Sequence, residues 1–174
     1  MQEQYSWLKK VQSPKVIAEA MAFYGVTEIV GPKHNATIMG WAKTLNMENT
    51  YNADEIAWCG LFVAIVVKNA NFEPVKAPLW ARNWASFGTK QTTAKLGDIL
   101  VFSRGTGGHV GFYVGEDKEA YHVLGGNQSN MVNVTRILKT RLLAIRRCPW
   151  KIAEPKEVKK IMLDAKGQIS KNEA

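Results

Sequence analysis

The stretch Asp54-Glu55-Ile56-Ala57-Trp58-Cys59-Gly60-Leu61-Phe62-Val63 decides how the rest of the chain is interpreted. Two acidic residues precede an apolar run that continues to Val67, which predicts a buried helix over 56–69, covered on nearly all sides. Cys59 lies near the start of this helix, where the partial positive charge of a helix N-terminus favours a thiolate. Although most buried cysteines only fill space, this position makes Cys59 a candidate nucleophile.

The second candidate catalytic residue is the histidine of Gly107-Gly108-His109-Val110-Gly111-Phe112-Tyr113-Val114-Gly115. The β-branched and aromatic residues predict a strand, and the glycines mark its edges. One activated cysteine and one histidine from a distant strand are the minimum apparatus for acyl transfer by a thiol. The imidazole takes the thiol proton and later returns it to the leaving amine.

A third side chain usually orients the histidine in such sites. The strand after the 116–119 turn offers His122, and the loop beyond it offers Asn127 and Gln128. Hairpin pairing about this turn places His109 opposite Gly126 and therefore favours Asn127, or Gln128, over His122. A bulge near the glycines would reverse the facing, so His122 stays as the alternative.

The order of the predicted elements indicates an α+β fold. Ser13-Pro14 begins a helix that Gly25 ends, and a short helix over 36–45 precedes the buried one. Residues 71–96 are irregular, apart from a short helix around Trp80 and Trp84. Five β-rich segments follow, separated by turn residues: Ile99–Ser103, Val110–Gly115, Ala120–Leu124, Met131–Ile137 and Leu142–Arg147. Helices followed by an antiparallel meander predict helices packed on one sheet.

The length of 174 residues predicts a single domain over 1–150 and a charged tail over 151–174. In the tail, apolar residues have the spacing of one amphipathic helix: Val158, Ile161, Met162 and Ala165. No secretory signal and no membrane-spanning run is visible, so we expect synthesis in the cytoplasm without a signal peptide. We expect a monomer.

The net charge of +8 predicts attraction to polyanions such as an anionic cell envelope. The basic residues are scattered, so no specific nucleic-acid site is predicted. The two cysteines, Cys59 and Cys148, do not make a disulfide framework. A zinc site of Cys59, His109, His122 and Cys148 would lack the closely spaced ligand pairs of structural zinc. We therefore expect no metal and no cofactor.

Several tryptophans are candidates for a substrate groove, because aromatic walls suit sugar and peptide ligands. Trp80 and Trp84 lie four residues apart, and core packing competes with binding as their role. The predicted substrate-binding residues are Trp58, Trp80, Trp84 and Gln128.

Taken together, the motifs resemble a known family. In order, the chain carries Trp58-Cys59-Gly60-Leu61-Phe62-Val63, Ala81-Arg82-Asn83-Trp84-Ala85-Ser86-Phe87-Gly88, Gly97-Asp98-Ile99-Leu100-Val101-Phe102, Gly108-His109-Val110-Gly111-Phe112-Tyr113-Val114-Gly115 and Val123-Leu124-Gly125-Gly126-Asn127-Gln128. This combination, within about 18–149, is similar to the NlpC/P60-type cysteine peptidases of bacteria and phages, a papain-like group close to the CHAP amidases.

The resemblance implies a papain-like fold and hydrolysis of an amide in peptidoglycan, either within the stem peptide or between sugar and peptide. It implies Cys59 as nucleophile, His109 as base, and Asn127 or His122 as third residue. Gly60 follows the cysteine, where small Ser or Ala is also common in the family. We expect this difference to weaken the resemblance little. The implied role is a phage lysin, a virion-associated wall enzyme or an effector delivered by other means.

Two other functions use the same residues. The Cys–His pair also serves acyltransferases and deamidases, since a fold does not decide the substrate. An inactive wall-binding module would retain only the scaffold.

Overall fold

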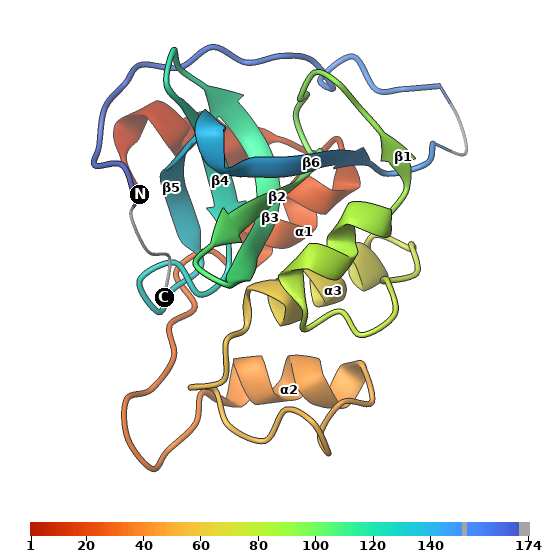
Figure 1. The fold of residues 1–174 in the computed structure, drawn as a ribbon, viewed down its shortest axis with the longest axis vertical. Helices are drawn as coiled ribbons and strands as arrows, with labels where there is room; N and C mark the ends of the chain where they lie inside the picture. Colours follow the sequence, from red (N-terminus) through yellow and green to blue (C-terminus); the bar gives the residue numbers. More distant parts are fainter. Residues whose placement is uncertain (151–152, 171–174) are drawn as a thin grey trace.

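The computed structural model describes residues 1–150 and 153–170. Its elements follow the predicted order of helices first and strands second (Figure 1). They are the 3-10 helix η1 (Glu3–Lys10), α1 (Lys15–Ala22), α2 (Ala36–Thr44), α3 (Cys59–Asn69), the 3-10 helix η2 (Ala81–Ser86), β1 (Thr89–Lys90), β2 (Ile99–Arg104), β3 (Gly107–Glu116), β4 (Ala120–Gly125), β5 (Asn133–Leu138), the 3-10 helix η3 (Lys139–Arg141) and β6 (Leu142–Arg147). The predicted α+β class is confirmed.

The sheet is antiparallel, with the strand order β1-β6-β2-β3-β4-β5. Strands β2 to β5 form the predicted meander, but β6 returns to pair with β2 instead of extending it beyond β5. Only the three residues of η3 join β5 to β6, a connection that reaches at most about 14 Å. In a flat sheet of this order β5 and β6 would lie about 19 Å apart. The sheet must therefore curl, and β6 crosses over it in Figure 1.

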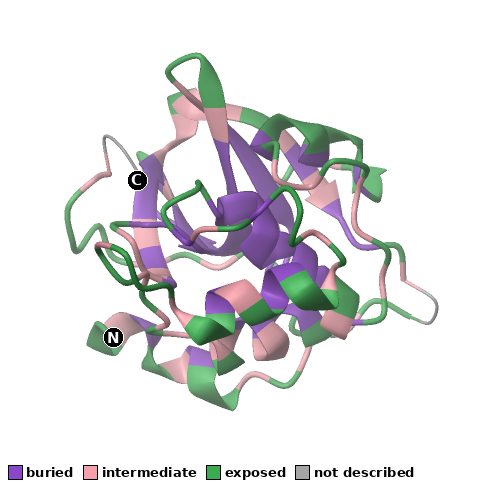
Figure 2. Cartoon of the chain, turned by 90° about the horizontal axis from the view of Figure 1, so that it is seen from below, coloured by how far each residue is buried: buried purple, intermediate pink, exposed green. Residues whose placement is uncertain are grey.

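The two faces of this curled sheet bury separate apolar clusters, and the buried residues gather in the interior of Figure 2. The larger cluster lies between the sheet and the helices, with α3 packed on β3 and α1 packed on α3. All residues of α3 from Cys59 to Val67 are buried, as the continuous apolar run predicts. The central helix that carries Cys59 is thus fixed on every side.

The tail differs from its prediction. Residues 153–170 contain no helix: after a turn at 156–157 they pass along the sheet, with isolated bridges from Met162 to Glu116 and from Ile169 to Arg136 (Figure 1). The tail N–H of Ile161 donates to the Tyr113 hydroxyl over 3.2 Å, and Leu163 donates to the Glu116 carbonyl over 2.9 Å. Val158 is buried and Ile161 packs against the second cluster. The available sheet acceptors and this apolar surface favour an extended strap over a helix.

Among residues 1–150 and 153–170, each helix is too short or too polar to span a bilayer.

Candidate active site

Cys59 is the first residue of α3, and only 3% of its surface is exposed. The residue after it must be very small, because a Cβ added to Gly60 would lie 2.1 Å from the Pro78 carbonyl oxygen. Even the methyl group of alanine at this position would require the 78–79 backbone to move. Gly60 lets the 78–79 backbone cross the helix start and form one side of the site.

The buried surroundings of Cys59 favour its neutral thiol over the thiolate. Burial raises its pKa, and this outweighs the lowering by the positive charge of Arg104 and by hydrogen bonding from the backbone of Val110 and Gly60. The position at a helix terminus alone predicted a lowered pKa for the Cys59 thiol. The direction is reversed because the sulfur is almost completely covered, which the sequence does not reveal. A base must therefore remove the proton when the sulfur attacks.

His109 lies on β3 and is fully buried. Its Nε2 is 3.0 Å from Oε1 of Gln128. The amide of Gln128 is oriented by its nitrogen, which donates to the carbonyl oxygens of Val123 and Asn133 at 3.2 and 2.7 Å. Oε1 therefore accepts from His109, which fixes the proton on Nε2 and makes Nδ1 the basic nitrogen. The backbone of the next residue, Val110, lies close enough to Cys59 to lower the pKa of its thiol.

The contact expected from Asn127 is thus made by its neighbour. Asn127 has a left-handed backbone, with φ at 53°, and the same holds for Ser129 and Asn130. Asn127 is buried, and its Oδ1 has no hydrogen-bond partner among the described residues. The alternation of side-chain directions along a strand does not continue through a left-handed turn. Strand pairing therefore predicted that the Asn127–Gln128 segment lies near His109, but not which of the two amides contacts it.

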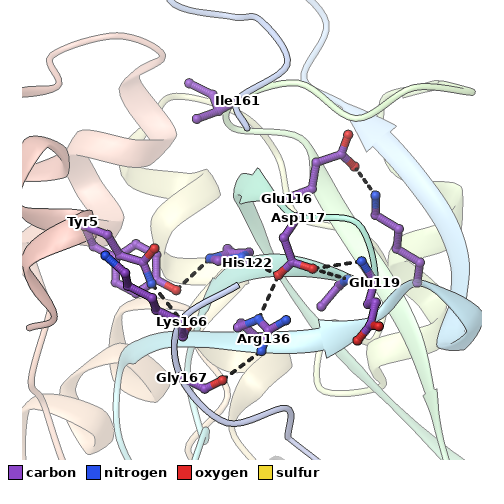
Figure 3. A network of polar contacts seen from close by, with 12 residues as sticks. Tyr5, Glu116, Asp117, Glu119, His122, Arg136, Ile161, Lys166 and Gly167 are labelled. Atoms are coloured by element: carbon purple, nitrogen blue, oxygen red, sulfur yellow. Dashed lines mark hydrogen bonds and ion pairs between the residues drawn. The ribbon is translucent and has the colours of Figure 1, made fainter. Parts of the chain in front are cut away.

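The alternative third residue, His122, belongs to a separate polar network (Figure 3). Its Nδ1 lies 2.7 Å from the Tyr5 hydroxyl and its Nε2 lies 2.9 Å from Asp117 Oδ2. Burial lowers the pKa of His122 despite the neighbouring Asp117. Arg136 joins Asp117 at 2.8 Å and donates to the carbonyl of Gly167 in the tail. His122 therefore ties the first helical segment and the tail to the sheet.

The tryptophans predicted to bind substrate divide into two groups. Trp58 and Trp84 are fully buried, and their indole N–H groups donate to Glu28 Oε2 and to the Pro78 carbonyl, both over 2.9 Å. These two rings belong to the core. Trp80 is 70% exposed and lines a pocket above Cys59.

This pocket has a volume of about 430 Å³ and opens over Cys59. Its walls come from the loop before α3, the 79–81 segment and the β2–β3 hairpin: Thr50, Ile56, Ala57, Cys59, Leu79, Trp80, Ala81, Arg104, Gly107 and Gly108. Arg104 is a site residue that sequence analysis missed. Its only sequence signal is a basic residue at the end of a strand, three residues before Gly107.

The remaining sequence candidates lie outside this arrangement. Cys148 is buried and free, and burial raises the pKa of its thiol to about 12. Within 1–150 and 153–170, no group of three or more His, Cys, Asp or Glu side chains is placed to hold a metal ion.

Comparison with known families gives one match. Residues 49–127 match the CHAP domain. The matched range begins in the loop before α3 and includes Cys59, Arg104 and His109. A search of curated proteins finds no significant match for the chain.

Proposed function

We propose that this chain is a cysteine hydrolase that cleaves an amide bond of bacterial peptidoglycan, because residues 49–127 match the CHAP domain and the sequence motifs resemble the NlpC/P60-type cysteine peptidases. CHAP domains are typically amidases or peptidases, which supports a peptidoglycan hydrolase in general. We propose that the cleaved amide lies either within the stem peptide or between sugar and peptide. We also propose that cleavage uses the cysteine mechanism. The observation that carries it is the arrangement of Cys59 at the start of α3 beside the backbone of the residue that follows His109.

In the proposed reaction, Nδ1 of His109 takes the Cys59 proton while the sulfur attacks the carbonyl carbon. The tetrahedral oxyanion forms near the first turn of α3, whose backbone N–H groups have no acceptor within the helix. His109 returns the proton to the amine, which leaves as the carbon–nitrogen bond breaks. Water, deprotonated by His109, then hydrolyses the thioester and restores the thiol.

Gln128 is the positioning residue in this scheme, because its amide oxygen holds the Nε2 proton of His109. We expect Gln128→Ala to lower kcat on the order of 10²-fold, since the imidazole would lose its fixed tautomer and orientation. Gln128→Glu keeps an acceptor for His109 but sets a carboxylate oxygen against the carbonyl oxygens of Val123 and Asn133, so we expect it to lose activity as well. The measurement is the rate of fragment release under substrate saturation.

Asn127→Gly is the matched control, because glycine tolerates the left-handed backbone at this position. We expect it to change kcat by less than about 5-fold. A larger loss for Asn127→Gly than for Gln128→Ala would instead assign the third catalytic position to Asn127.

We propose that the protein acts on the bacterial cell wall, as a phage lysin, a virion-associated enzyme or a delivered effector. The +8 net charge supports approach to an anionic envelope. Because this attraction is electrostatic, we expect binding to bacterial cell walls to weaken as the salt concentration rises.

The function is tested by mass spectrometry of fragments that the protein releases from purified peptidoglycan. We expect defined fragments whose masses identify one cleaved amide, with release lost after alkylation by iodoacetamide and retained in a chelator. If no peptidoglycan type yields fragments, the wall substrate is wrong. Transfer of an acyl group to an added amine without net hydrolysis would favour an acyltransferase.

A further inference from the structure

Arg104 is the last residue of β2 and lies opposite Gly107 in the β2–β3 hairpin. Its guanidinium makes no hydrogen bond or ion pair with the rest of the described chain, and Nη1 is buried without an acceptor. The other sheet arginines are paired: Arg136 with Asp117, Arg147 with Asp98, and Arg146 with the Phe87 carbonyl. A partly buried guanidinium without an acceptor is costly, because desolvation is not compensated.

The unpaired guanidinium faces the candidate reaction centre. Arg104 and Cys59 line the same pocket, and the Arg104 charge acts on the sulfur. Among the residues that the structure describes, no acidic side chain lines this pocket. The remaining walls are largely apolar, with Leu79, Ile56 and the exposed ring of Trp80. The pocket therefore combines one fixed positive charge with surfaces suited to the flat faces of peptide groups.

We infer that Arg104 is a substrate-recognition residue, whose guanidinium binds a carboxylate of the peptide close to the amide that Cys59 attacks. This inference rests on the proposed function for the identity of the ligand as a peptide. Guanidinium and carboxylate groups match in a two-bond geometry that supplies the missing acceptors. The enzyme would thus select peptides with a free carboxylate beside the scissile bond and discriminate against those in which it is amidated.

A test that requires no hydrolysis compares two alkylating reagents of similar shape. Iodoacetate carries a carboxylate and iodoacetamide carries the neutral amide, and both transfer their carbon to the Cys59 sulfur with loss of iodide. The ratio of the two rates cancels any change in thiolate fraction that a variant causes. Labelling at Cys59 is scored on the peptide by mass spectrometry, so that Cys148 does not contribute.

We expect Arg104→Gln to lower the iodoacetate-to-iodoacetamide ratio by about tenfold, and Arg104→Lys to lower it less. The exposed Lys118, in the turn at the opposite end of β3, provides the control. Lys118→Gln removes the same charge and should leave the ratio unchanged. A ratio that is equal in wild type and Arg104→Gln overturns the inference.

The second arm uses two synthetic peptides that differ only in a carboxylate or carboxamide beside the bond cleaved by the wild type. We expect wild type to favour the carboxylate at least about tenfold in kcat/KM, and Arg104→Gln to lose the preference. Equal kcat/KM for the two peptides in wild type overturns the inference. If no peptidoglycan is cleaved and the peptides cannot be designed, a lowered alkylation ratio in Arg104→Gln would reject the proposed hydrolysis and retain Arg104 as a carboxylate-binding residue.

Discussion

Replacing Cys59 by alanine is expected to lower the rate of peptidoglycan fragment release by at least about 10³-fold. In the proposed mechanism the sulfur forms the covalent intermediate, and no other described side chain in the pocket is a nucleophile of comparable strength. The loss should appear in kcat, because the pocket walls that bind substrate are unchanged. Fragment release by wild type and variant, measured on the same purified peptidoglycan, gives the ratio.

The matched control is Cys148→Ala, which removes the other buried thiol. We expect its activity to stay within about 2-fold of wild type, since Cys148 lies outside the pocket lining. Circular dichroism should show that both variants are folded. Fragment release by Cys59→Ala at the wild-type rate would eliminate the cysteine mechanism, whatever the substrate.

Replacing Asp98 by alanine is expected to destabilise the fold by about 3–5 kcal/mol. Asp98 receives two hydrogen bonds from Arg147, 2.7 Å from Nε and 2.8 Å from Nη2, and one from the Lys95 N–H over 2.8 Å. The side chains of Asp98 and Arg147 are 1% and 10% exposed. Removing the carboxylate therefore leaves a largely buried guanidinium without its main partner. Urea unfolding at pH 7 measures the change in free energy.

Glu154 offers the control on the same arginine. It lies 3.3 Å from Arg147 Nη1, but its side chain is 32% exposed. Glu154→Ala should cost less than about 1 kcal/mol, because water replaces a partly exposed partner. Adding Arg147→Met to Asp98→Ala should recover part of the lost stability, since no unpaired charge would remain. Equal costs for Asp98→Ala and Glu154→Ala would contradict this account.

The local sequence was sufficient to predict the principal elements. The continuous apolar run after Glu55 predicted the buried helix, which begins at Cys59 in the structure. The short β-rich segments beyond Gly97 predicted β2 to β6 with only small shifts at their ends. These features depend on periodicity and turn residues, which act over a few neighbouring positions.

Contacts between distant segments were decided only by the tertiary structure. The apolar residues of the tail have the spacing of a helix. The tail is nevertheless not helical, because its backbone forms hydrogen bonds with the N–H and carbonyl groups at the end of β3. His122 is a plausible catalytic residue in the sequence, yet Tyr5 and Asp117 occupy both of its ring nitrogens. Neither outcome can be derived from residues adjacent in the chain, because each depends on what packs against them.

The sequence by itself determined the central helix, the α+β order and the pairing of a helix-start cysteine with a strand histidine as the candidate chemistry. The tertiary structure decided that Gln128 faces His109, that burial raises the pKa of the Cys59 thiol and that Arg104 lines the pocket. The physical reason is that side-chain direction after a left-handed turn, desolvation of a thiol and the absence of a counter-charge are properties of packed surroundings. Those surroundings combine residues from the N-terminal helices, the sheet and its connecting loops.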